Sequence, residues 1–313
     1  MSIVERALKR LQQSGQAAAQ AARAPAAPTV RRAEPSTPAL PVAPTREAPV
    51  RRQLGDAAKT LHVDFERLRR EGLLPPEHQQ RELSHQYRIL KRPILKHAFG
   101  PEAPATDAGA PSPRTLMVTS ALPGEGKTFT SINLALSLAL EKDHSVILID
   151  GDAPKPHVSK AFGIGGEPGL LDLLMNPDLP VESCVLPTDV RGLYLLPVGR
   201  RSETATELLA SARMRQVLEE LGQLDGNGVV LLDSPPILPT SEAQVLASLF
   251  GQVVLVVRAG ATPQQAVTDA LGIIGDGPRI GLVLNQALHD NVGGYYGYGY
   301  GDGFLDSMQT DKP

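Results

Sequence analysis

The residues Ala121-Leu122-Pro123-Gly124-Glu125-Gly126-Lys127-Thr128 follow the apolar run 115–120 and precede a helical pattern at 127–140. A strand, a glycine-containing turn that ends in Gly-Lys-Thr, and a helix in this order predict a phosphate-binding loop. In such a loop, successive backbone N–H groups and the positive end of the helix dipole surround the phosphates. Gly124 and Gly126 would let the backbone approach the ligand without an intervening Cβ atom.

The side chains of this loop have separate expected roles. Lys127 would reach the β- and γ-phosphates of a nucleotide, and the Thr128 hydroxyl would bind Mg²⁺. The residues expected to contact the nucleotide here are Pro123, Gly124, Glu125, Gly126, Lys127, Thr128 and Phe129. Such a loop usually begins with Gly, whereas this chain has Ala121, which fits if its φ is negative.

Two other apolar runs end in aspartate. The first, 146–149, leads to Asp150-Gly151-Asp152, and the second, 229–232, leads to Asp233-Ser234-Pro235-Pro236. A strand that ends in Asp delivers a carboxylate to the carboxyl edge of a sheet, where it can hold Mg²⁺ directly or through water. An Asp at a strand end also occurs for turn reasons alone. Two such strands beside a phosphate loop favour a site in which one carboxylate organises metal and another accepts a proton.

The second half of the chain alternates between strand-like and helical patterns. Apolar runs recur at 115–120, 145–150, 192–197, 228–233, 252–257 and 279–284, and helical patterns occur at 127–140, 205–222, 241–250 and 263–275. Continuous apolar strands separated by helices are typical of a mostly parallel, doubly wound α/β sheet covered on both faces. We therefore expect the P-loop NTPase architecture, with the ligand at the carboxyl ends of the strands.

Composition limits the class of protein. The hydrophobic content of 42% is enough for a core, and the net charge of −3 gives no global signal for nucleic-acid binding. The single cysteine, Cys184, excludes a disulfide framework or a Cys-x-x-Cys site within one chain. No apolar run approaches the length of a membrane helix, and the N-terminus has no secretory core. These observations predict a cytoplasmic protein.

We expect four segments along the chain. Residues 1–55 are Pro- and Ala-rich and read as a disordered linker, with nine Lys/Arg against three Glu in residues 1–54. Residues 56–100 form a helical extension with a helix at about 77–96, residues 101–290 form the P-loop domain, and residues 291–313 form a flexible Gly/Tyr-rich tail. The basic excess would give a weak attraction to anionic lipid or an acidic partner, but we favour the simpler interpretation, a solvated linker.

The three motifs together resemble a known family. Pro-Gly-Glu-Gly-Lys-Thr, Ile-Leu-Ile-Asp-Gly-Asp and Leu-Leu-Asp-Ser-Pro-Pro, followed by a tyrosine-rich end, are similar to the Walker A, A′ and B motifs of the bacterial tyrosine kinases of capsule and exopolysaccharide synthesis. The pattern Tyr87-Arg88-x-x-Lys91-Arg92-Pro93 and the Gly-Tyr-Tyr tail are most similar to the exosortase-associated tyrosine autokinases. The resemblance covers residues 60–301 by motif order and implies an ATP:protein-tyrosine phosphotransferase.

The resemblance implies roles for particular residues. Lys127 and Thr128 match the phosphate and Mg²⁺ residues, and Asp150 matches an aspartate that meets the acceptor tyrosine hydroxyl. Asp152 and Asp233 match the metal-organising pair. Asn285 matches an asparagine that contacts adenine in related ATPases, although a turn role at a strand end would also explain it.

The chain departs from the family pattern in two places. Lys155 stands in Ala153-Pro154-Lys155-Pro156, where the family usually has arginine shortly after Asp152, so it substitutes in charge alone. The family's oligomerising helix carries Glu-x-x-Arg-x-x-Arg, and the aligned residues here are His85, Arg88 and Lys91. If Glu–Arg pairs between subunits build a ring, these changes would weaken it.

Four of the six tyrosines lie close together near the C-terminus. Tyr295, Tyr296, Tyr298 and Tyr300 alternate with glycines between Gly293 and Gly301. Such glycine content precludes a stable helix or strand, so the phenols would sit on a tether that can enter an active site of the same or a neighbouring subunit. A sticky tail that binds aromatic or polysaccharide surfaces is the alternative, and the position of the tail after a nucleotide-binding domain favours autophosphorylation.

The resemblance also implies partners. Family members act with an inner-membrane polysaccharide co-polymerase that activates them, form homo-oligomers, and are opposed by a tyrosine phosphatase, which would place this chain at the inner membrane through a partner.

The rival hypothesis is a non-kinase ATPase switch of the chromosome-partition or septum-site type. Those proteins carry a second lysine early in the loop, where this chain has Leu122 and Pro123, and the chain shows no basic DNA face.

Overall fold

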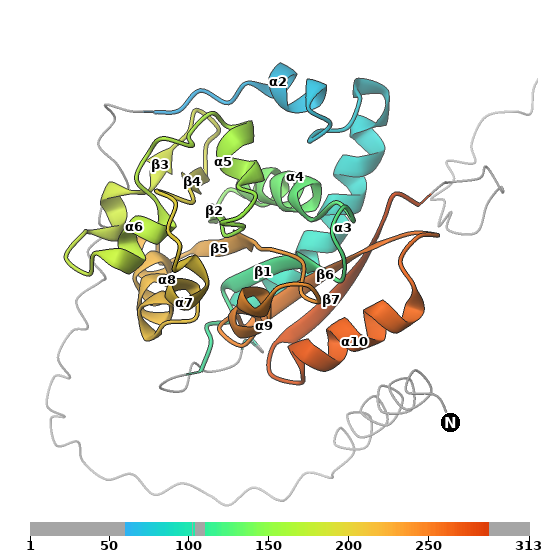
Figure 1. Cartoon of the computed structure of the whole chain (residues 1–313). Coiled ribbons are helices and arrows are strands. Elements are labelled where there is room, and N and C mark those ends of the chain that lie inside the picture. Colours follow the sequence, from blue (N-terminus) through green and yellow to red (C-terminus); the bar gives the residue numbers. More distant parts are fainter. Residues whose placement is uncertain (1–59, 102, 104–109, 288–313) are drawn as a thin grey trace, which may run out of the picture. The chain divides into compact units, whose positions relative to one another are not determined.

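A computed structural model describes residues 60–101, 103 and 110–287. A seven-stranded sheet runs through this part of the chain in the order β3-β4-β2-β5-β1-β6-β7 (Figure 1). The strands are β1 Thr115–Ser120, β2 Ser145–Asp150, β3 Leu186–Pro187, β4 Leu193–Leu196, β5 Gly228–Asp233, β6 Gln252–Arg258 and β7 Arg279–Asn285. The linker and tail predicted at 1–55 and 291–313 lie outside the described residues.

The sheet confirms the predicted mostly parallel, doubly wound α/β class. Every neighbouring pair is parallel except β3 and β4, which pair antiparallel at the edge. The chain leaves central β1 for β2 on one side and later returns for β6 on the other, which creates the switch point at which such sheets bind ligands. The short edge strand β3 was not predicted, because two residues carry no periodic signal.

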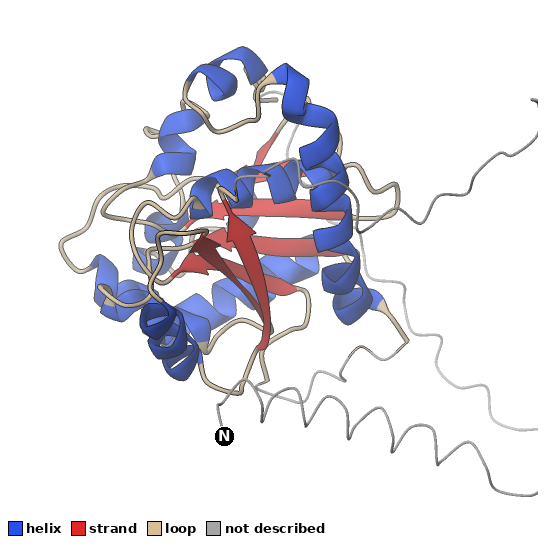
Figure 2. Ribbon diagram, turned by 90° about the vertical axis from the view of Figure 1, so that its right-hand side faces the viewer, coloured by secondary structure: helices blue, strands red, loops and turns tan. Residues whose placement is uncertain are grey.

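Helices cover both faces of the sheet (Figure 2). They are α2 Phe65–Arg70, α3 Gln80–Phe99, α4 Lys127–Ala139, α5 His157–Ala161, α6 Leu170–Met175, α7 Ala205–Leu209, α8 Ala212–Leu224, α9 Ser241–Ala247 and α10 Gln264–Ile274. Alternate strand residues face opposite ways. Met117 therefore belongs to the core cluster that includes residues of α6, α8, α9 and α10, whereas Leu116 belongs to the cluster that includes residues of α3, α4 and α5.

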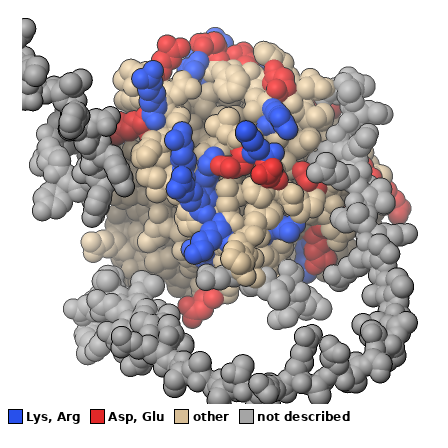
Figure 3. All heavy atoms as spheres, turned by 180° about the vertical axis from the view of Figure 1, so that it is seen from behind, with Lys and Arg blue, Asp and Glu red and all other residues tan. Residues whose placement is uncertain are grey.

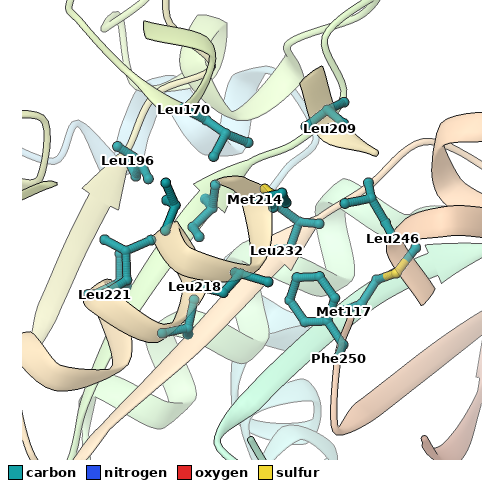
Figure 4. Packing of buried hydrophobic residues seen from close by; sticks show 14 of the residues in the cluster. Met117, Leu170, Leu196, Leu209, Met214, Leu218, Leu221, Leu232, Leu246 and Phe250 are labelled. Carbon is teal, nitrogen blue, oxygen red and sulfur yellow. The ribbon is translucent and has the colours of Figure 1, made fainter. Parts of the chain in front are cut away.

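The core on the face of the sheet that contains Met117 is closely packed. In Figure 4, Met214 and Leu218 of α8 lie over Leu232 of β5, and Phe250 lies beside Met117 of β1. Phe250 is among the largest fully buried side chains of the described part. This packing makes the sheet a rigid support for the loops at its carboxyl edge.

The helix expected at 205–222 is wrong in one respect, because the structure has two helices there. Helix α7 ends at Leu209, and α8 begins at Ala212. Between them, Ser211 adopts an extended backbone with φ −78° and ψ 160°, and its hydroxyl donates to the Leu208 carbonyl at 2.6 Å. A serine that bonds the preceding turn competes with helix continuation, which explains the break.

The helix expected at about 77–96 lies slightly later. A 3₁₀ turn, Glu77–Gln79, leads into α3, which continues to Phe99. Its Lys91 is buried and binds the Ser137 carbonyl at 2.6 Å and Glu141 at 2.7 Å within the same chain. Lys91 is therefore committed to α4, whereas His85 and Arg88 are exposed.

Candidate functional site

The carboxyl ends of three adjacent strands bring the predicted motifs together. Strand β5 lies between β1 and β2, so the phosphate loop after β1 is next to the aspartates that end β5 and β2. Asp150 and Asp233 are direct register partners, and Val118 pairs with Asp233. Residues separated by more than a hundred positions thus meet at one edge of the sheet.

The loop between β1 and α4 has the conformation that its glycines allow. Gly124 and Gly126 have φ of 81° and 94°, a region that residues with a Cβ rarely adopt. A Cβ at Gly126 would also collide with the Asn285 side chain, whose Nδ2 donates to the Glu125 carbonyl at 2.9 Å. In the described part the only non-glycine residue with positive φ is Gln286, so Ala121 meets the condition set for it.

Glu125 stabilises the loop from inside. It is buried, and its Oε2 accepts from the Leu122 N–H at 2.9 Å. Its Oε1 accepts a short hydrogen bond from Thr262, which lies after β6. Only its backbone is thus available to a ligand. No local pattern in the sequence indicated this contact, because Thr262 lies 137 positions after Glu125.

Lys127, Thr128, Asp152 and Asp233 lie together in one largely buried cluster. Lys127 Nζ lies 2.9 Å from Asp152 Oδ2, and the Thr128 hydroxyl donates to Asp233 Oδ2 at 2.8 Å. Ser131, one turn along α4, donates to Asp233 Oδ1 at 2.9 Å. Sequence reasoning missed Ser131, although its position three residues after Thr128 places it on the same face of the helix.

The charges of this network perturb one another. Burial by itself lowers the pKa of Lys127, but the carboxylates of Asp233, Asp152 and Asp150 outweigh it and raise that pKa above its ordinary value. Burial raises the pKa of Asp233, against the opposing effect of Lys127. Lys127 is therefore held as a cation by the surrounding carboxylates.

Asp150 has a different environment from the other two aspartates. It is fully buried, and its Oδ2 accepts from the Ser159 N–H at 2.6 Å. Its Oδ1 is buried and has no hydrogen-bond partner among the described residues. Burial raises the pKa of Asp150 to about 7. A carboxylate with one free oxygen and a pKa near neutrality is suited to proton transfer.

A cavity of about 540 Å³ opens beside the loop. Six of the predicted nucleotide contacts line it: Gly124, Gly126, Lys127, Thr128, Phe129 and Asn285. The remaining two, Pro123 and Glu125, do not. The cavity is also lined by Glu71, Gly72, Leu73, His157 and Gln286, which sequence reasoning missed. Their spacing in the chain shows no periodicity that would have identified them.

Across the described ranges, no group of three or more His, Cys, Asp or Glu side chains is arranged to hold a metal ion by itself. Mg²⁺ is commonly held by one or two carboxylates together with the phosphates of its nucleotide. The hydroxyl of Thr128 and the carboxylates of Asp152 and Asp233 fit that donor set. In the same part of the chain no helix has the length and apolarity needed to span a bilayer.

The chain is similar in sequence to known proteins. A sequence profile of the AAA domain matches residues 114–274. The chain is 31% identical over 191 residues to the putative tyrosine-protein kinase CapB of Staphylococcus aureus, covering 60% of this chain and 82% of CapB. It is 31% identical over 194 residues to the tyrosine-protein kinase YwqD of Bacillus subtilis, covering 61% and 80% of the two chains. The chain belongs to the bacterial tyrosine-protein kinases.

Solved structures of kinase domains agree with this membership. The VpsO kinase domain is 30% identical, with a TM-score of 0.54 over 68% of this chain and 100% of that one. The kinase domain of the Escherichia coli tyrosine kinase ETK is 31% identical, with a TM-score of 0.52 over 59% and 72%. Membership of this kinase family implies nucleotide binding, and the rival hypothesis of a non-kinase ATPase switch is correspondingly weaker.

Proposed function

We propose that this kinase is an ATP:protein-tyrosine autokinase whose acceptors are Tyr295, Tyr296, Tyr298 and Tyr300. The observation that carries the proposal is the buried Asp150 carboxyl, with one oxygen free, beside a phosphate loop. The loop amides from Gly124 to Thr128, together with Lys127, would bind the phosphates of ATP. Phe129 and Asn285 would face its nucleoside, and Pro123 and Glu125 would contribute through the backbone of the loop.

A magnesium ion would complete the site. Thr128, Asp152 and Asp233 would hold it, directly or through water, and it would supply charge neutralisation for the transferred phosphoryl group. Ser131 would keep the Asp233 carboxylate in position through its 2.9 Å hydrogen bond. Asp152 would then serve both the metal and Lys127, which explains why the lysine and the carboxylate already lie 2.9 Å apart.

Asp150 would act on the acceptor. Its free Oδ1 would accept the proton of a tyrosine hydroxyl as the phenol oxygen attacks the γ-phosphorus and ADP leaves. Lys127 would stabilise the charge that develops on the phosphoryl oxygens. The products would be phosphotyrosine and ADP, with the proton left on Asp150.

The length of the tail is compatible with this chemistry. Strand β7 ends at Asn285, four strand intervals from β2, which is about 19 Å at the usual spacing. Tyr295 lies eight residues after position 287, and eight steps of extended chain span up to about 26 Å. The acceptor tyrosines could therefore reach Asp150 from the same chain as well as from a neighbour.

The family resemblance extends the proposal to a biological setting. The kinase would regulate the synthesis or export of an extracellular polysaccharide, activated by an inner-membrane co-polymerase protein and opposed by a tyrosine phosphatase. It would act as a homo-oligomer in the cytoplasm, associated with the membrane through that partner.

The test is incubation of the full chain with Mg-ATP, followed by mass spectrometry of its tyrosines. We expect phosphotyrosine at positions 295–300 in the wild type and none in Lys127→Met. Lys142→Met, at an exposed lysine outside the site, is the matched control and should behave as wild type. ATP hydrolysis without phosphotyrosine would instead support the ATPase switch, and phosphotyrosine that persists in Lys127→Met would refute the assigned site.

A further inference from the structure

Residues 61–74, here called the strap, run across the top of the domain in Figure 1, from the edge strand β3 to the start of α3. The first end is attached next to β3. Leu61 N–H donates to the Pro187 carbonyl at 2.8 Å, and Asp189 N–H donates to the Leu61 carbonyl at 3.0 Å. The Asp189 carboxylate accepts from Val63 N–H at 3.0 Å and bonds the His62 ring.

The middle and far end of the strap are fixed to α5 and α4. The side chains of Val63 and Leu68 are each 1% exposed and belong to the core on that face of the sheet. Arg67 Nη2 donates to the Lys160 carbonyl at 2.7 Å. Asn133 Nδ2 of α4 donates to the Leu73 carbonyl at 2.9 Å. The strap is thus held in place by buried side chains and by hydrogen bonds at both of its ends.

The far end of the strap forms part of the nucleotide cavity. Glu71, Gly72 and Leu73 line it together with the phosphate loop. Gly72 has φ of 70°, and a Cβ there would meet no atom within 4 Å, so this turn faces open space. Leu73 and Phe129 line the same cavity and both pack on the core of that face.

The chemistry of these residues suits the nucleoside part of a nucleotide. Glu71 is the only acid among the residues that line the cavity. Its Oε1 accepts from Arg67 Nε at 3.1 Å, and a carboxylate can accept further hydrogen bonds, such as those from ribose hydroxyls. Leu73 and Phe129 offer an apolar surface, which suits a purine face. The amides and Lys127 of the loop account for the phosphates.

We propose that the strap is the wall that binds the nucleoside, so that its attachment at Asp189 sets the affinity for ATP from outside the cavity. The inference rests on the proposed nucleotide site. Asp189 is a positioning residue, because it would act through Val63 and the strap rather than touch the ligand. Leu73 would make the direct contact.

The experiment measures the binding of two probes, Mg-ATP and inorganic tripolyphosphate, to the full chain by calorimetry. Asp189→Ala and Leu73→Ala should each raise the Kd for ATP about fivefold, which is about 1 kcal/mol, and leave the Kd for tripolyphosphate unchanged. Asp189→Asn keeps an oxygen that can accept from Val63 N–H, so this variant should retain most of the wild-type affinity for ATP. Asp225→Ala removes a similar acceptor of a backbone N–H, at 3.2 Å, outside the strap and serves as the control.

Two results would overturn the inference. An unchanged ATP affinity in both variants would mean that the strap does not touch the nucleoside, and equal weakening of both probes would mean that it supports the phosphate loop instead. Thermal melting of each variant identifies loss of folding separately. The kinase proposal is judged independently, since a wild type that binds ATP but forms no phosphotyrosine would refute it and leave the strap inference intact.

Discussion

Asp150 and Asp152 are two residues apart, and the fold gives them opposite properties. Asp152 accepts from Lys127 Nζ and from the Lys155 N–H, so both its oxygens are held. Asp150 is fully buried, and one of its oxygens has no hydrogen-bond partner within the described part. Because burial disfavours the charged form, the pKa of Asp150 rises to about 7. In the sequence, only the family resemblance assigns these two carboxylates different roles, and the structure adds the physical difference between them.

This difference predicts a pH dependence for the reaction. Asp150 accepts a proton only when ionised, and burial raises its pKa to about 7, so kcat/KM for autophosphorylation should rise with pH and level off above that value. Asp150→Asn should lower the rate by about 10²–10⁴ and abolish the inflection near pH 7, while ATP affinity changes little. Phosphotyrosine formation measured from pH 5.5 to 8.5 tests this. An inflection that survives in Asp150→Asn would assign the titration to another group.

At the scale of elements, the sequence predicted the strands that are continuous apolar runs. Strands β1, β2, β5 and β6 were predicted at nearly their observed bounds, because each is a continuous apolar run buried on both faces. Ser211 divides one predicted helix in two through a side-chain bond to the Leu208 carbonyl, which periodicity does not detect. The strap was missed because its hydrogen bonds to Pro187 and Asp189 join positions more than a hundred residues apart.

Helix α6 depends on a single carboxylate. Asp172 Oδ2 accepts from the N–H groups of Gly169 at 3.0 Å and Arg200 at 3.1 Å, and Oδ1 accepts from Arg200 Nε at 2.6 Å. The Arg200 side chain is 83% exposed, so solvent screens the ion pair and the two backbone bonds dominate. Asp172→Ala should lower the free energy of unfolding by about 2–3 kcal/mol, measured by urea denaturation at pH 7. A loss below about 0.5 kcal/mol would show that the connection after β4 holds without this carboxylate.

The same carboxylate gives a pH dependence of stability. Burial opposes ionisation of Asp172, but its hydrogen bonds from Arg200 and Gly169 hold its pKa below the ordinary value. Its contribution is therefore complete above the unfolded-state pKa of about 3.9 and is lost as pH falls through the lower folded-state pKa. The stability difference between wild type and Asp172→Ala should be constant from pH 5 to 8 and shrink below about pH 4.

At the scale of the whole molecule, charge is unevenly distributed. Figure 3 shows Lys and Arg side chains gathered on the face that carries α3, where Arg81, Arg88 and Arg92 are exposed. Lys91 is excluded from this surface because it is buried against Ser137 and Glu141. Lys91 is thus engaged within its own chain, where it attaches α3 to α4. We expect any subunit contact made by α3 to use the exposed arginines.

Autophosphorylation would change the charge of the molecule more than any mutation. The chain carries a net charge of −3, and phosphates on the four tail tyrosines would add about −6 to −8. If subunits associate through docked tails, repulsion among these phosphates should dissociate the assembly. We expect the mass measured by light scattering at 50 mM salt to fall after incubation with Mg-ATP and to recover after phosphatase treatment, with a smaller change at 500 mM salt because screening is stronger. Lys127→Met should keep its mass throughout, and a wild-type mass that stays constant despite complete phosphorylation would show that the tails do not hold the assembly.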